Sequence, residues 1–156
     1  MPWIQTKYFG PLDCPSDSLF EFPSGLPGFE VERSFVFLDR PDTDPILFLQ
    51  SVAHREVCFV LLPILVADSH YRLSLTPEDL AALKLPMDSQ PQIGRDVLCA
   101  AVVCAADESR RAPTVNLLAP IVVNLREHIG IQAILTESGY SHRHTLFHTE
   151  EPAPCL

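Results

Sequence analysis

The sequence predicts a mainly β fold, a small antiparallel β-barrel-like domain with one or two short helices. Short runs of β-branched and aromatic residues recur along the chain, and clusters of Pro, Gly, Asp and Ser separate them. Fifteen prolines stand against six glycines, and proline punctuates a chain into short elements because it donates no backbone hydrogen bond. Many short strands in one domain imply an antiparallel barrel or a sandwich.

Ten strands are expected, each a short run bounded by turn residues. In chain order they span residues 5–9, 18–22, 35–39, 46–51, 57–62, 71–74, 97–104, 114–117, 120–124 and 131–136. The last two flank a short loop that contains a glycine, which is typical of a β-hairpin. We therefore expect these two strands to pair antiparallel.

One segment has the signals of a helix. Thr76 offers an N-cap hydroxyl, Pro77 stands at the first helical position, and two acids follow in the first turn. A helix is predicted over residues 77–84. Because Leu80 and Leu83 share one of its faces, this helix should cover the sheet.

Length and composition indicate one globular domain. The chain has 156 residues, of which 47% are hydrophobic and 20% charged. We expect a single barrel domain over residues 1–147, followed by a mobile C-terminal tail over residues 148–156, where no periodicity appears. The formal net charge is −9, which repels phosphate backbones. Direct nucleic-acid binding is therefore disfavoured, and a basic protein partner is favoured.

Cysteine usage and hydropathy indicate the compartment. The five cysteines form no C-x-x-C pair, so neither a disulfide framework nor a zinc knuckle is expected, and a reducing cytoplasm fits best. The first residues lack the basic and apolar regions of a secretory signal, and the longest apolar run is too short to span a bilayer. A cytoplasmic location without membrane contact is expected.

Three histidines near the end of the chain are candidates for metal chemistry. His142, His144 and His148 would share one face of a strand and could approach a metal if a fourth ligand came from elsewhere. The sequence has no H-E-x-x-H motif and no G-x-S-x-G elbow beside them. The alternative function is therefore a small-molecule-binding β-barrel or a metal-assisted hydrolase that uses these histidines, and the simpler interpretation is a polar strand.

The most informative local feature is Phe-Pro-Ser-Gly-Leu-Pro-Gly-Phe at residues 22–29. Two prolines and two glycines fix a stiff, sharply turned loop, while Phe22, Leu26 and Phe29 supply apolar anchors. Such a loop either presents an apolar contact to a partner at little entropic cost or plugs one end of the barrel. Further along, Asn116 and Asn124 lie in an apolar run, where asparagines usually bond to neighbouring backbone groups.

Five motifs occur in order along the chain: TKYFG at 6–10, FPSGLPGFE at 22–30, FLQS at 48–51, TVNLLAPIVVN at 114–124 and RH at 143–144. Taken together, they resemble the successive motifs of the FliW family of flagellar assembly factors. The resemblance implies a small antiparallel β-barrel-like fold without a cofactor. It also implies a non-enzymatic role: members bind the translational regulator CsrA, block its binding to flagellin mRNA, and are themselves sequestered by flagellin. Ile131 and Thr145 depart from the residues that the family commonly has there, which are lysine and proline.

The resemblance and the chemistry of the loop together predict a set of partner contacts, with no catalytic residue and no metal ligand. The predicted contacts are Phe9, Gly25, Leu26, Pro27, Phe29, Asn116, Asn124, Arg143 and His144.

Overall fold

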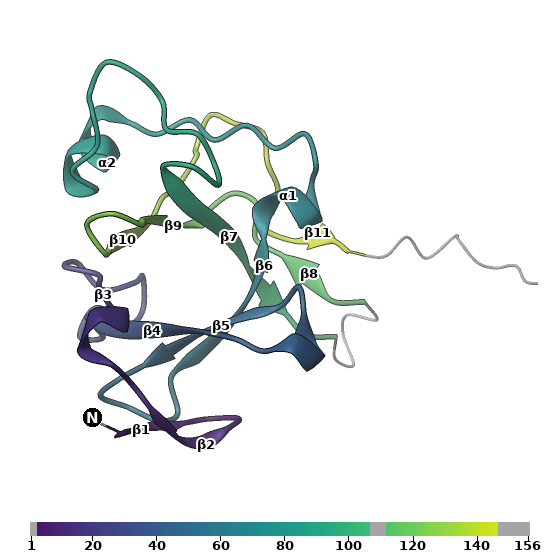
Figure 1. Cartoon of the computed structure of the whole chain (residues 1–156). Coiled ribbons are helices and arrows are strands. Elements are labelled where there is room, and N and C mark those ends of the chain that lie inside the picture. The colour runs from purple at the N-terminus through teal and green to yellow at the C-terminus, as the bar shows by residue number, and fades with distance from the viewer. Residues whose placement is uncertain (1–2, 107–111, 147–156) are drawn as a thin grey trace, which may run out of the picture.

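Seven strands close into a barrel in the computed structural model, which describes residues 3–106 and 112–146 (Figure 1). The barrel strands are β3 (Leu19–Glu21), β4 (Ser34–Asp39), β5 (Leu47–Ser51), β6 (Cys58–Pro63), β7 (Val97–Cys104), β9 (Ile121–Asn124) and β10 (Ile129–Gln132). Neighbouring strands are antiparallel except at the closure, where β10 pairs in parallel with β3 through Ile129 and Glu21. The predicted mainly β barrel is confirmed, with one parallel pair added.

Strand β7 organises one side of the barrel, because it is long enough to pair with three strands. It pairs with β6 along one edge and with β9 over the first half of the other edge. Over the second half of that edge it pairs with β8 (Thr114–Val115), which in turn pairs with β11 (His144–Thr145). The last described strand therefore lies beside the end of β7.

A separate hairpin packs against the barrel wall at the N-terminus. Strands β1 (Trp3–Thr6) and β2 (Gly10–Asp13) form a two-stranded antiparallel sheet (Figure 1). Ile4 of β1 and Cys14, the residue after β2, are buried in one cluster with Val36 of β4.

The strand predicted over residues 5–9 is wrong beyond Thr6. The Thr6 hydroxyl accepts a hydrogen bond from the Phe9 amide at 2.9 Å and donates one to the Gly10 carbonyl at 2.7 Å. Gly10 has a φ of +68°, which glycine adopts without steric cost. The chain therefore turns here and returns as β2. The sequence did not indicate this strand, because it contains a proline at position 11.

The strand predicted over residues 71–74 is also wrong, because side chains satisfy its backbone instead of a neighbouring strand. The amide of Arg72 donates to the Tyr140 hydroxyl at 2.8 Å. Both backbone groups of Leu75 bond to the Gln90 side chain. Tyr71 stacks on Tyr140, with ring centroids 4.3 Å apart. The backbone of this segment is extended, but its neighbours decide whether an extended backbone joins a ladder.

The predicted hairpin near the end of the domain is confirmed as the antiparallel pair of β9 and β10. Strand β10 begins at Ile129, two residues before the predicted start. Gly130 faces the ring of Phe22, and a Cβ added there would lie 2.6 Å from that ring. The glycine that suggested a turn thus belongs to the strand, where it makes room for a buried aromatic side chain.

Two short α-helices pack on the outer face of β7 and β9, where Ile64, Leu80 and Leu83 join Val97, Cys99 and Val122 in one buried cluster. Helix α2 (Pro77–Ala82) begins at a capping box in which the Asp79 amide donates to the Thr76 hydroxyl, and it buries Leu80 and then Leu83 just past its end. Helix α1 (Ile64–Ala67) follows β6. Short 3₁₀ turns are η1 (Ser16–Ser18) and η2 (Pro41–Thr43). Within the described residues, no helix is long and apolar enough to cross a membrane.

Apolar side chains fill the inside of the barrel. The fully buried residues include Phe22, Phe35, Leu49, Leu61 and Ile121. Such packing leaves the described loops and strand ends, and not a lumen, as the place for a binding site. The expected mobile tail at 148–156 lies outside the described residues.

Candidate functional site

The Pro-Gly loop, residues 22–30, turns back on itself between β3 and β4. Gly25 has a φ of +65°, and a Cβ added there would lie 2.5 Å from the Glu30 carbonyl oxygen. The backbone of Leu26 bonds in both directions to that of Phe29, with N···O distances of 3.3 and 2.7 Å. Glycine is therefore required at position 25, because the backbone of Glu30 approaches it closely. The loop has a fixed shape.

This loop forms one wall of an open groove of about 360 Å³. Other walls come from β6, β7, β8, β10 and the turn before β11. The lining residues are Leu26, Pro27, Phe59, Val102, Cys104, Thr114, Asn116, Gln132, His142 and Arg143. Phe29, which is 41% exposed, packs edge-on against Phe59 with ring centroids 5.1 Å apart. The groove thus has an apolar floor with an aromatic side chain at its edge.

The groove brings together residues from both ends of the sequence that the sequence analysis singled out. Leu26 and Pro27 face Asn116 and Arg143 across it, and Phe29 joins through its contact with Phe59. Gly25 shapes the loop, while His144 lies next to the groove in β11, paired with Val115. Six of the nine predicted residues thus line the groove, contact its lining or shape its wall, and His144 adjoins it.

Phe9 lies elsewhere, in a cluster of aromatic rings and cations. Its ring centroid is 5.0 Å from that of Phe48, and the Arg40 guanidinium lies over it at 4.7 Å. Tyr8 stands beside both rings, half exposed, with the Lys7 ammonium 5.5 Å from its centroid. This aromatic–cation cluster is a second exposed surface feature, separate from the groove.

Asn124 points into the molecule and is 4% exposed. Its amide nitrogen donates to the Leu83 carbonyl at 2.7 Å, and its amide oxygen accepts from the backbone of Arg126 and Glu127. It therefore connects the end of α2 to the β9–β10 turn. Asn116 also bonds to backbone, since its oxygen accepts from the amides of Leu118 and Ala119. Both asparagines have the backbone-satisfying role expected from their apolar setting.

A buried acid that the sequence analysis did not single out lies behind the Pro-Gly loop. Glu32 is 5% exposed, accepts a hydrogen bond from the Ser51 hydroxyl, and lies 2.6 Å from Nδ1 of His54. The glutamate stands between the serine and the histidine, whereas activation of a serine requires the histidine to contact the hydroxyl. Ser51 is also fully buried. This triplet therefore anchors loops and does not form a nucleophilic site.

The histidine and cysteine chemistry considered above is not supported by the geometry. Within residues 3–106 and 112–146, no three His, Cys, Asp or Glu side chains lie close enough to hold a metal ion. His148 falls outside those residues. Burial raises the pKa of the Cys99 thiol to about 12 and that of Cys58 to about 11, so both stay protonated and unreactive at neutral pH.

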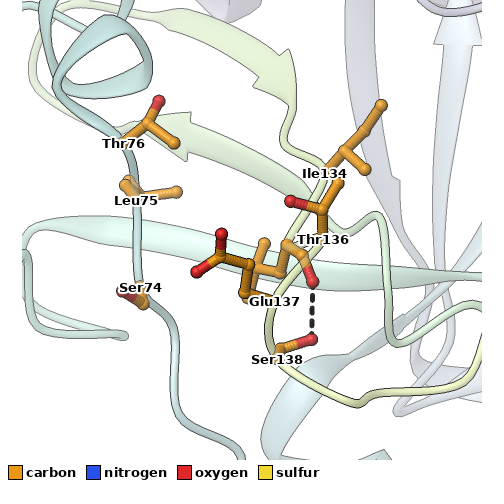
Figure 2. A pocket seen from close by; sticks show the side chains of 8 residues that line it. Ser74, Leu75, Thr76, Ile134, Thr136, Glu137 and Ser138 are labelled. Carbon is orange, nitrogen blue, oxygen red and sulfur yellow. Dashed lines mark hydrogen bonds between the residues drawn. The ribbon is translucent and has the colours of Figure 1, made fainter.

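A broader depression of about 450 Å³ lies between the segment before α2 and the segment after β10 (Figure 2). Ser74, Leu75 and Thr76 form one side, and residues 134–138 form the other. The Ser138 hydroxyl donates a hydrogen bond to the Leu135 carbonyl at 2.7 Å, so this hydroxyl stabilises the turn. Among the described residues, Glu137 is the one titratable residue in the lining, so these residues do not form an acid–base pair there.

Comparison with known proteins agrees with this geometry. A crystal structure of the flagellar assembly factor FliW matches the fold with a TM-score of 0.83 and 32% sequence identity, over 97% of this chain and 100% of that one. The flagellar assembly factors FliW of Desulfitobacterium hafniense (strain Y51) and Anoxybacillus flavithermus are 37% and 35% identical over 144 residues. These alignments cover 92% of this chain and 90% and 94% of the two relatives.

The barrel with its loop-built groove is thus the fold of a flagellar assembly factor. The profile of the FliW protein family matches residues 3–146, and the chain belongs to the FliW family.

Proposed function

We propose that this chain is a non-enzymatic regulator in the cytoplasm that binds the translational regulator CsrA and blocks its binding to flagellin mRNA. Flagellin binds the chain in turn and sequesters it, which releases CsrA. The observation that carries the proposal is the groove, where side chains far apart in the sequence meet as a contact surface for one of these two protein partners, in a chain of the FliW family. No cofactor takes part in this scheme.

The charge of the chain supports a basic, RNA-binding partner. A body with a net charge of −9 attracts a basic protein and raises its association rate. Once docked, the same charge repels the RNA that the partner would otherwise bind. Electrostatic repulsion then extends the block beyond the atoms in contact, and the chain itself needs no direct contact with nucleic acid or membrane.

The predicted contact residues have different roles in this proposal. Leu26, Pro27, Phe29, Asn116 and Arg143 contact a partner directly in the groove, and Gly25 holds the loop in shape. His144 supports the groove from β11, Phe9 contributes a second contact surface, and Asn124 holds the β9–β10 turn to the end of α2. The exposure of Pro27, Phe29 and Arg143 and the backbone hydrogen bonds of Asn124 support these roles, and the buried Leu26 forms the floor of the groove.

Regulation in this scheme is a competition between binding equilibria. Flagellin lowers the concentration of free regulator, so the fraction of CsrA that is bound to RNA rises without any covalent step. Flagellin synthesis is thereby coupled to the consumption of flagellin.

The test is a titration of CsrA from the same cell, bound to a labelled flagellin leader RNA, with the purified chain. We expect RNA release at micromolar concentrations or below, and recovery of RNA binding when flagellin is added. Phe29→Asp should weaken at least one of the two protein interactions, whereas Val31→Asp, at an exposed position outside the groove lining, is the matched control. Failure to bind CsrA at micromolar concentration would remove the proposal.

A further inference from the structure

The floor of the groove accepts an apolar side chain. Leu26 is 2% exposed, while Phe59 and Val102 are half-buried and face the open volume. Phe29 stands at the edge and remains 41% exposed. An apolar group placed here would remove further carbon surface of Phe29, Phe59 and Val102 from water, which is the main driving force for association.

Two amide side chains in the wall present one hydrogen-bond donor and one acceptor. The oxygen of Asn116 must face the amides of Leu118 and Ala119, so its NH₂ group turns away from them. The nitrogen of Gln132 must face the Ala119 carbonyl, so its oxygen turns away. Among the described residues, neither outward group has a partner. A donor beside an acceptor complements the C=O and N–H of a peptide group.

The rim of the groove carries a positive charge, that of Arg143, although the protein is acidic. Arg143 is exposed there, and the lining contains neither Asp nor Glu within the part of the chain that the structure describes. Elsewhere the charge is dominated by acids, with a net −9 over the chain. A guanidinium binds a carboxylate through paired, charge-assisted hydrogen bonds. The rim therefore favours an acidic group and disfavours a basic one.

We infer that this groove binds an extended segment of a partner protein that carries an apolar side chain and, next to it, a carboxylate. The inference rests on the proposed function and deepens it, because it divides the two partners between two surfaces. A basic RNA-binding regulator is repelled by the rim and docks on the acidic surface outside the groove. The groove is the contact for the other partner.

The test uses two capped peptides, acetyl-Leu-Ala-Glu-Leu-amide and acetyl-Leu-Ala-Lys-Leu-amide, added to the full ¹⁵N-labelled chain and followed by NMR. The glutamate peptide should shift the side-chain amide resonances of Asn116 and Gln132 and should bind about tenfold more tightly than the lysine peptide, the worth of one charge-assisted pair. Arg143→Glu should reverse this preference. Arg72→Glu makes the same charge change at an exposed site outside the groove lining and should leave the preference intact.

Equal binding of the two peptides, or an unchanged preference in Arg143→Glu, would overturn the inference. So would a dimer that dissociates in Arg143→Glu, since a second copy of the chain would then fill the groove. The same variant separates the inference from the proposed function: Arg143→Glu should still bind CsrA. Loss of CsrA binding in this variant would refute the division of surfaces and leave the proposed function standing. A wild-type chain that binds the glutamate peptide but not CsrA would refute the proposed function and leave peptide binding by the groove standing.

Discussion

The carboxylate of Glu32 lies 2.5 Å from the hydroxyl of Ser51, and both side chains are buried. The same hydroxyl accepts hydrogen bonds from the amides of Ala53 and His54, while His54 Nδ1 contacts the other carboxylate oxygen. This network joins the segment after the Pro-Gly loop to the turn between β5 and β6. The shape of the groove wall therefore depends on residues that do not line the groove.

Ser51→Ala should destabilise the protein by about 1–3 kcal/mol, because it removes one hydrogen bond from a buried carboxylate and leaves two backbone amides without their acceptor. Urea unfolding followed by circular dichroism measures the change. Ser69→Ala, at an exposed site, serves as the control and should stay within about 0.5 kcal/mol of the wild type. Equal stability of the two variants would mean that the network contributes nothing to folding.

Gly25→Ala should destabilise far more than Gly139→Ala, although both glycines have a positive φ. The conformational strain of alanine in the left-handed region, about 1–2 kcal/mol, is common to both variants. A Cβ at Gly139 meets open space, whereas at Gly25 it would lie 2.5 Å from the Glu30 carbonyl. Thermal unfolding should show a clearly lower Tm for Gly25→Ala, and similar Tm values would contradict the tight turn of the loop.

The sequence alone was sufficient to predict the elements that form from neighbouring residues or that have a long apolar pattern. Strand β7 has the predicted bounds of residues 97–104, and the capping signal at Thr76 marks the start of α2. The segment 71–74 failed because the Arg72 amide bonds to the Tyr140 side chain and the adjoining Leu75 bonds to the Gln90 side chain, which no local pattern reveals. The strand at 5–9 failed for a local reason, a threonine side chain that closes a turn.

The candidate site was predictable in its parts but not in its assembly. The Pro-Gly loop was recognisable because proline and glycine restrict the backbone in known ways. Its position opposite Asn116 and Arg143 depends on the pairing of β7 with β8 and of β8 with β11. Glu32 gave no sequence signal, since an isolated glutamate in a polar loop is usually exposed. The pairing of β4 with β5, in which Phe35 lies opposite Ser51, brings Glu32 to the Ser51 hydroxyl.

Asn124→Ala should lower stability without changing the chemistry of the groove. The substitution leaves the Leu83 carbonyl and two turn amides without their bonds, for which we expect a loss of about 1–3 kcal/mol. At a temperature where the variant is fully folded, its affinity for the two capped peptides should equal that of the wild type. Weaker peptide binding by a fully folded Asn124→Ala protein would show that the β9–β10 turn also positions the groove.

Alkaline pH should destabilise the protein through its buried thiols. Burial raises the pKa of Cys99 from 9.0 to about 12 and that of Cys58 to about 11. The folded chain thus keeps protons that the unfolded chain releases. The stabilisation that these protons provide is fully present below pH 9, and it is lost as the pH rises through the folded-state pKa values of the two thiols.

The free energy of unfolding should therefore fall between pH 9 and pH 11, at up to about 1.4 kcal/mol per pH unit for each proton retained. Urea titrations at successive pH values measure this slope. Cys99→Ala should start from a lower stability at pH 7, because it removes a buried side chain, but should show a shallower alkaline decline. Cys104→Ala, at the exposed end of β7, should decline as the wild type does. If Cys99→Ala kept the full slope, protons on other groups would account for the alkaline loss of stability.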